Sequence, residues 1–114
     1  MLEVRLAVSP SEVAEDALDQ LRVHAVVVNR GEEPVDTQLV SSTLLVDGKR
    51  NFPWSMSIAN GARDAREHAL PPGERVVAER VLGPALVSEP GEHEVVLEVG
   101  GVRSAPALVI VGQG

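Results

Sequence analysis

The chain has 114 residues, with 17 acidic and 10 basic residues, a formal net charge of −7, no cysteine and two aromatic residues. This length is typical of one domain, so we expect residues 1–114 to form a single domain. The lack of cysteine excludes disulfides, thiolate catalysis and cysteine-based zinc sites. The acidic excess argues against a phosphate-binding surface, and the basic residues are scattered along the sequence. Nucleic acid is therefore predicted not to be a partner.

The sequence contains no apolar stretch as long as a membrane span, so membrane insertion is not expected. The first residues also lack the basic region and apolar block of a signal peptide. If Met1 is the native start, the protein is expected in the cytoplasm. If the chain is an excised domain, its location stays open.

The composition favours β-strands. The chain has 20 valines, and β-branched residues favour the pleated, half-buried positions of a strand. Alternation of apolar and polar residues predicts strands over residues 2–9 and 21–28. Between them, residues 10–20 fit either a capped helix or an extended stretch that crosses between sheets, and we favour the extended form. A third strand is expected to start near Val35 and to break or bulge at the serines 41–42.

The second half of the chain continues this pattern. A tight turn at Asp47 and Gly48 is followed by a strand in which Trp54, Met56 and Ile58 alternate. The next segment is predicted to be a solvated loop or short helix. Three further strands are predicted after it, the last with a proline that favours an edge position or a bulge. The loop or short helix spans residues 62–70, and the three strands span residues 75–82, 93–99 and 102–111.

About seven to eight short strands with regular turn signals predict an all-β fold. The best single architecture is an antiparallel immunoglobulin-like (Ig-like) β-sandwich of Greek-key type without a disulfide. The final strand ends in the apolar, uncharged residues 108–111, which an unprotected edge would expose. A homo-oligomer formed through this strand edge is one expectation.

Turn chemistry supports a family resemblance. Residues 26–35 contain an Asn-x-Gly turn at the end of a strand, residues 70–74 read Leu-Pro-Pro-Gly-Glu, and residues 90–99 open with Pro-Gly before the last hairpin. In this order the segments resemble bacterial Ig-like domains that serve as accessory or adhesion modules. Such motifs specify a fold far better than a function.

A narrower resemblance concerns the middle of the chain. Residues 46–49 read Val-Asp-Gly-Lys and precede Trp54-Ser55 and a later Pro-Gly-Glu turn, which is similar to the bacterial intracellular proteinase inhibitor (BsuPI-type) family. The resemblance implies an Ig-like sandwich and inhibition of intracellular serine proteases. No inhibitory loop is assigned, because no reactive-site motif matches residue by residue.

Catalytic and metal-binding patterns are not found. The serines do not occur in a nucleophile motif, and His24, His68 and His93 lack the close spacing of metal ligands. His93 is in phase with the predicted core face, and the resemblance to Ig-like domains implies that it replaces an aromatic residue there and forms hydrogen bonds at the edge of the sandwich. The acidic cluster of residues 12–19 lacks the alternation of a calcium loop and is expected to be solvated. We therefore predict a non-enzymatic protein without a cofactor or metal.

The segment that most resembles a binding surface spans residues 49–56. It contains both aromatic residues next to basic ones, a composition enriched at protein interfaces. The predicted protein-contact residues are Lys49, Arg50, Phe52, Trp54 and Met56. Within this set, Trp54 is expected in the core and Phe52 on the surface. The predicted function is a protein-interaction or structural module, with intracellular serine protease inhibition as the alternative and metal binding as a third option.

Overall fold

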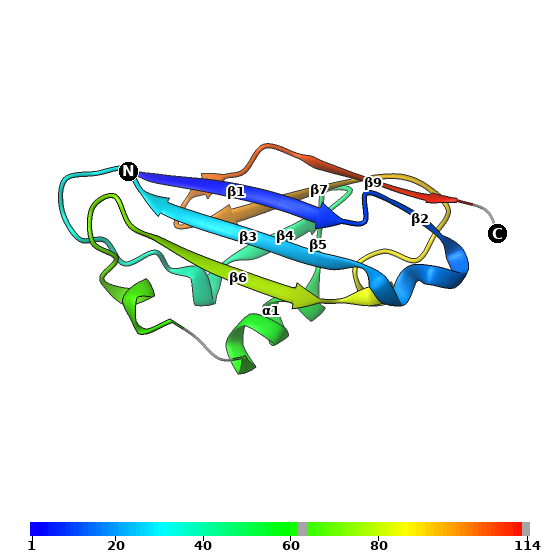
Figure 1. The fold of residues 1–114 in the computed structure, drawn as a ribbon, viewed down its shortest axis with the longest axis horizontal. Helices are drawn as coiled ribbons and strands as arrows, with labels where there is room; N and C mark the ends of the chain where they lie inside the picture. Colours follow the sequence, from blue (N-terminus) through cyan, green and yellow to red (C-terminus); the bar gives the residue numbers. More distant parts are fainter. Residues whose placement is uncertain (62–63, 113–114) are drawn as a thin grey trace.

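The structure is a computed structural model that describes residues 1–61 and 64–112. Within these residues, nine strands form two sheets, and short helical segments connect them (Figure 1). The prediction of a mostly β protein without a disulfide is confirmed. Among the described residues, no helix combines the length and the apolar character that crossing a membrane requires.

The smaller sheet contains three antiparallel strands in the order β1-β3-β6, namely β1 (Leu2–Ser9), β3 (Arg22–Asn29) and β6 (Arg75–Val81). The register pairs Leu2 with Asn29 and Ser9 with Arg22, so β1 and β3 match along their full length. These three strands agree with the alternation seen in the sequence.

The larger sheet has the order β2-β9-β7-β4-β5, and β8 also pairs with β7. Its strands are β2 (Glu12–Ala14), β4 (Thr43–Val46), β5 (Lys49–Arg50), β7 (Gly91–Val99), β8 (Val102–Arg103) and β9 (Ala107–Gly112). The predicted final strand is therefore two strands, separated at Pro106. The short β2 runs parallel to β9 and pairs with Ile110, so it covers part of the edge that we expected to be open.

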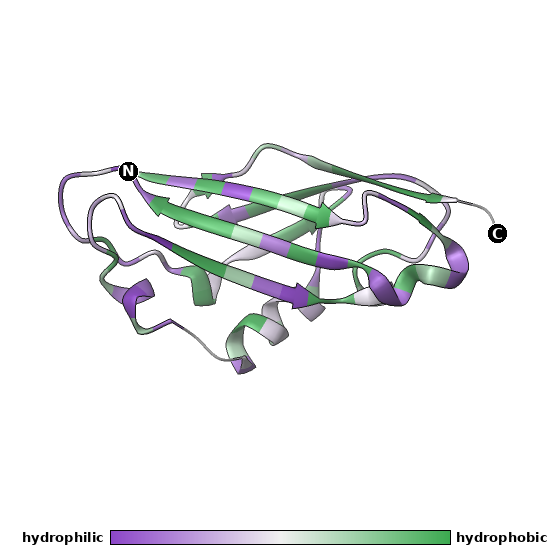
Figure 2. Ribbon diagram, in the orientation of Figure 1, coloured by the Kyte–Doolittle hydropathy of each residue, from purple (hydrophilic) through white to green (hydrophobic). Residues whose placement is uncertain are grey.

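The core lies between the two sheets. Alternate residues of each strand point inward, and Figure 2 shows the resulting alternation of hydrophobic and hydrophilic residues along β1, β3 and β6. Aliphatic side chains supply nearly all of the buried surface. Among the most deeply buried strand residues are Val23, Val27, Leu44, Val76, Val95, Leu97, Val99 and Val109.

The predicted strand through Trp54 and Ile58 is wrong, because residues 52–60 form the helix α1 (Phe52–Asn60). Asn51 caps this helix, since its Oδ1 accepts a hydrogen bond of 2.8 Å from the backbone N–H of Trp54. Trp54 and Ile58 lie four residues apart and share the buried side of the helix. Met56, which a strand would have turned inward, is 60% exposed.

The predicted third strand is wrong near Val35, whereas its continuation after the serines is present as β4 (Thr43–Val46). Val35 makes only an isolated bridge to Leu70, and the chain then forms a 3-10 turn, η2 (Leu39–Ser41). The backbone N–H and the hydroxyl of Thr37 both donate to the carbonyl of Glu67, at 2.8 and 2.9 Å. These bonds tie the segment to a neighbouring loop instead of a sheet.

Three more 3-10 segments complete the fold: η1 (Glu15–Gln20), η3 (Ala65–His68) and η4 (Gly83–Ala85). The stretch for which two forms were expected, residues 10–20, thus contains both an extended part, β2, and helical turns, η1. Of the predicted loop over residues 62–70, positions 62–63 lie outside the described residues.

Candidate interaction surfaces

The outward side of the smaller sheet carries four exposed arginines. Arg5 lies on β1, Arg22 on β3, Arg75 on β6, and Arg30 directly follows β3. The antiparallel register places Arg5 beside Val26, and Val26 in turn beside Val77 of β6. We call this surface, defined by Arg5, Arg22, Arg30 and Arg75, the arginine face.

Two carboxylates on the same side hold some of these guanidinium groups in place. Glu3 accepts hydrogen bonds from Arg5 and from Arg30, and Glu79 accepts one of 3.0 Å from Arg22. Hydrogen bonds from Arg30 and Arg5 lower the pKa of Glu3. Four arginines against two carboxylates leave two positive charges in excess, in a chain whose net charge is −7. The arginine face is thus a local reversal of the overall charge.

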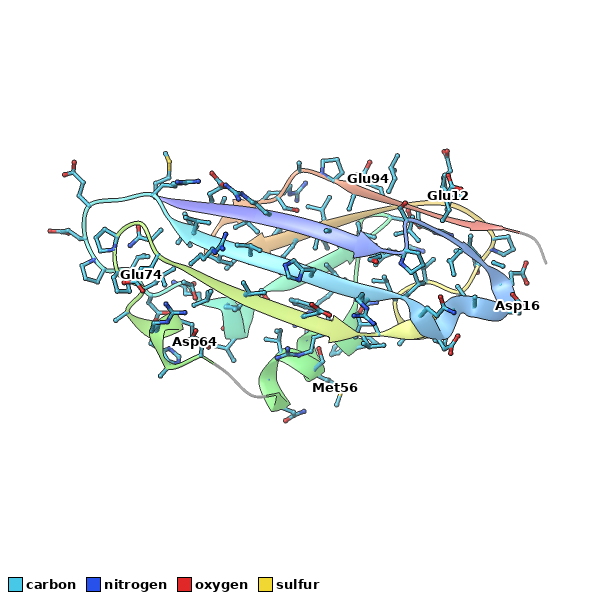
Figure 3. All side chains as sticks on the ribbon, viewed as in Figure 1. Glu12, Asp16, Met56, Asp64, Glu74 and Glu94 are labelled. Carbon is cyan, nitrogen blue, oxygen red and sulfur yellow. The ribbon has the colours of Figure 1, made fainter. Side chains whose placement is uncertain are left out.

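The arginine face ends in an open concavity of about 630 Å³ near the turn that precedes β6. Arg66 of η3 also borders it, but its guanidinium already contacts Asp64 at 2.7 Å and Glu74 at 2.8 Å. Figure 3 shows Asp64 and Glu74 close to each other at this end of the molecule. The concavity therefore combines the arginines of the sheet with a rim of one arginine and two carboxylates, whose formal charge is −1. Its lining residues are Arg5, Val28, Arg30, Asp64, Arg66, Gly73, Glu74, Arg75 and Val77.

The outward side of the larger sheet has the opposite charge. Glu92, Glu94 and Glu98 alternate along β7, and Glu12 of β2 lies in the same row as Glu92, because both residues pair with Ile110. We call Glu12, Glu92, Glu94 and Glu98 the glutamate face. One arginine of this sheet, Arg103, donates to Glu98 at 2.9 Å. The exposed Leu108 lies beside Glu94.

The predicted protein-contact residues are divided between surface and core. Lys49 and Arg50 form the exposed edge strand β5, and Phe52 and Met56 are 65% and 60% exposed on α1. Figure 3 shows Met56 at the margin of the molecule, pointing away from the sheets. The Arg50 guanidinium lies 5.1 Å from the centroid of the Phe52 ring, within the range of a cation–π contact. We call Lys49, Arg50, Phe52 and Met56 the α1 patch.

Trp54 does not belong to that surface. It is fully buried, and its indole N–H donates a hydrogen bond of 2.9 Å to the hydroxyl of Ser42. This is the core position that the sequence led us to expect for the only tryptophan. The ring anchors α1 to the larger sheet and leaves the opposite side of the helix free.

His93 is buried at the start of β7, as its phase in the strand predicts. Its Nδ1 lies 2.7 Å from a carboxylate oxygen of Asp47, and its Nε2 lies 2.7 Å from the carbonyl oxygen of Glu89. Both partners can only accept, so both ring nitrogens donate and the imidazolium form fits best. Burial lowers the pKa of His93, but the hydrogen bonds to Asp47 and to the Glu89 carbonyl outweigh it, and the pKa is raised overall.

This arrangement fits a structural bridge better than a catalytic one. The His93 imidazolium has no free nitrogen for a substrate or a metal ion, and the other Asp47 oxygen accepts the backbone N–H of Glu94 at 2.8 Å. His24 lies on the other sheet with its Nδ1 3.2 Å from Glu79, and His68 lies exposed on η3. Among the described residues, no three His, Cys, Asp or Glu side chains are grouped so that they could hold a metal ion.

One buried carboxylate was not foreseen in the sequence, where residues 62–70 read as a solvated segment. Glu67 is 2% exposed, and in the described part of the chain its Oε1 has no hydrogen-bond partner. It borders a cavity of about 20 Å³ beside Ile58 and Val76. A space of this size holds about one water molecule, so it is too small for a substrate.

The comparisons with known proteins give one informative result. No family model and no curated protein sequence matches the chain. Among solved structures, the chain is similar to the Pseudomonas fluorescens alkylpurine DNA glycosylase AlkC bound to DNA containing an abasic site analog. The TM-score is 0.58 and the sequence identity is 14%. The match covers 97% of this chain but only 30% of the glycosylase chain, so the similarity shows a shared fold with a part of a larger protein.

The prediction that nucleic acid is not a partner is contradicted by this finding, because the structural neighbour is bound to DNA. The prediction rested on net charge and on the scattered positions of the basic residues. Neither property describes a surface. The sheet order β1-β3-β6 brings together arginines that lie up to 70 positions apart in the sequence (Arg5 and Arg75).

Proposed function

We propose that the protein is a non-enzymatic binding module whose arginine face contacts the sugar–phosphate backbone of nucleic acid. We further propose that the two sheets form an Ig-like sandwich of Greek-key type. The observation that carries the function is the concentration of Arg5, Arg22, Arg30 and Arg75 on one side of one sheet, in an otherwise acidic chain. The DNA-bound structural neighbour supports the same partner.

The chemistry of the arginine face suits phosphate. Arginine donates two parallel hydrogen bonds to a phosphate group, and such contacts fix a protein on nucleic acid without reading the sequence. Glu3 and Glu79 hold Arg5, Arg22 and Arg30 in place across the sheet, while the remaining N–H groups of each guanidinium can face a ligand. With two excess charges we expect weak, sequence-independent binding that falls steeply as salt rises.

The test is a titration of a fluorescently labelled mixed-sequence DNA duplex, followed by anisotropy at increasing salt. The triple variant R5Q/R22Q/R75Q should lower the affinity about tenfold or more and should reduce the slope of log affinity against log salt by about two. The variant K49Q/R50Q/R103Q is the matched control, because it changes the net charge equally but lies outside the arginine face. Equal losses in the two variants, or no binding by the native protein at about 50 mM salt, would contradict the proposal.

A protein partner at the α1 patch is the second candidate function. It is favoured by the exposure of Phe52 and Met56, two large apolar side chains on one side of α1. Serine protease inhibition remains an alternative proposal. A stoichiometric inhibition assay with an intracellular serine protease separates it from both binding functions, because neither requires contact with a protease active site.

A further inference from the structure

We propose that the α1 patch docks a segment of a partner protein in which apolar side chains are flanked by Asp or Glu. This inference rests on the second candidate function, contact with a protein, and adds the chemistry of the partner. It uses residues that the nucleic-acid function leaves unexplained, because the α1 patch lies outside the arginine face.

The apolar part of the α1 patch is held rigidly. Phe52 and Met56 are four residues apart, so they project from the same side of α1. The helix is fixed at its start, where the side-chain amide of Asn51 donates to the carbonyl of Ala85 at 2.9 Å and its carbonyl oxygen caps Trp54. A helix held this way presents Phe52 and Met56 from a backbone that is already ordered, so binding costs only the rotamer freedom of the side chains, which favours association.

The charged group that lies against this apolar pair is a cation, because the Arg50 guanidinium is 5.1 Å from the centroid of the Phe52 ring. Lys49 and Arg50 precede Phe52, and the helix Phe52–Asn60 contains no charged residue. The nearby carboxylate of Asp47 is engaged by His93 and by the backbone N–H of Glu94. A partner that covers Phe52 and Met56 therefore places its rim against Arg50, while Lys49 precedes it on the other side of the edge strand, and carboxylates on the partner complement this positive charge.

Size also limits the partner. Two exposed side chains and two cations make a small surface, so the docked element is a short segment and its affinity is modest. A short amphipathic helix with apolar residues at i and i+4 fits the spacing of Phe52 and Met56, which also follows a helical turn. A nucleic acid could contact Lys49 and Arg50, but it would gain little from Phe52 and Met56.

The experiment uses a synthetic helical peptide of about 16 residues, with leucines at i and i+4 and glutamates beside them. It is titrated into the isotopically labelled full chain and followed by amide chemical shifts. We expect shifts concentrated in residues 49–60 and an affinity about fivefold higher than that of the same peptide with glutamine in place of glutamate. The variant F52S/M56S should lose the binding, whereas L108S, which removes an exposed leucine from the other face, should keep it.

The proposal is overturned if both peptides bind equally, if the shifts lie away from residues 49–60, or if F52S/M56S binds as the native protein does. It is also overturned if light scattering shows a dimer that F52S/M56S abolishes, because the occupant would then be a second copy of the chain. A third outcome is that the native protein, but not F52S/M56S, captures a protein from a lysate, while the acidic peptide does not bind. This outcome would overturn the proposed chemistry of the partner but not the contact of the α1 patch with a protein. DNA titration of F52S/M56S, expected to match the native protein, keeps this test separate from the nucleic-acid function.

Discussion

The outer faces of the two sheets are built by the same alternation of residues but carry opposite charges. On β1, β3 and β6 the outward positions hold three arginines and two glutamates, with Arg30 directly after β3, whereas on β2 and β7 they hold four glutamates. Net charge averages the two faces and conceals the basic one. The comparison shows that the sign of a chain's charge excludes a partner only when the charges are spread evenly over the surface.

The two faces also differ in how their charges are balanced. On the arginine face, Glu3 pairs with both Arg5 and Arg30. Glu79 pairs with both Arg22 and His24. On the glutamate face, a single described pair links Arg103 to Glu98. Exposed pairs of this kind add little stability, so both faces can be altered without unfolding the protein.

The sharpest test of the comparison replaces one arginine on each sheet. Arg22 pairs with Glu79 and Arg103 pairs with Glu98, and both arginines are exposed on a strand. We expect R22Q to lower the affinity for duplex DNA about fivefold and the salt slope by about one, because one phosphate contact is lost. R103Q should bind as the native protein does, and anisotropy titrations at matched salt measure both.

Removing charge from the glutamate face should have a smaller effect of the opposite sign. The variant E92Q/E94Q/E98Q leaves the arginine face intact and reduces only the long-range repulsion of phosphate, so we expect the affinity for DNA to rise about twofold at low salt. The gain should vanish at high salt, where such repulsion is screened. A gain that persists at high salt would mean that the glutamate face contacts the DNA directly.

The smallest expected effect concerns stability and distinguishes the two histidines that lie on strands. The pKa of His93 is raised above its ordinary value of 6.5, so its contribution to stability is complete below that value and is lost as pH rises through the pKa of the folded state. The pKa of Asp47 is lowered, chiefly by its hydrogen bond to His93, and its contribution is lost as pH falls below the ordinary range of aspartate. The bridge is therefore strongest in mildly acidic solution.

Denaturant unfolding of the native protein and of H93Q measures this contribution as a difference. Near pH 5.5 we expect the free energy of unfolding of the native protein to exceed that of H93Q by about 1 kcal/mol, and the difference to shrink toward alkaline pH. The control H24Q should show a smaller difference, because His24 is half-exposed in its pair with Glu79. A difference between native protein and H93Q that grows with pH would contradict the imidazolium bridge.

Alternation of apolar and polar residues correctly predicted the strands that have one side in the core and the other in solvent. Val23, Ala25 and Val27 of β3 alternate because one side of the strand faces the core. The same pattern was misleading at Trp54 and Ile58, where four-residue spacing in a helix and two-residue spacing in a strand coincide. Asn51 as a helix cap with Pro53 in the first turn was the local signal that could have corrected it.

The arginine face could not be found in this way. Arg5, Arg22, Arg30 and Arg75 lie in separate segments, and only the pairing of β1 and β6 with β3 puts them on one side of one sheet, with Arg5, Arg30 and Arg75 toward one end and Arg22 at the other. The spacing of residues along the sequence does not show which strands pair, so it could not indicate that these arginines share one face. By contrast, the five predicted contact residues lie within one short segment of the sequence, and the four of them that form the α1 patch are exposed as a contact surface requires.

We propose that the smaller sheet, and not the larger one, contacts nucleic acid. The most direct measurement is a titration of isotopically labelled protein with a mixed-sequence DNA duplex at low salt, followed by amide chemical shifts. We expect shifts along the outward positions of β1, β3 and β6, with no shifts along β7, which carries most of the glutamate face. Shifts concentrated on β7 and β9, or no shifts at all, would contradict it.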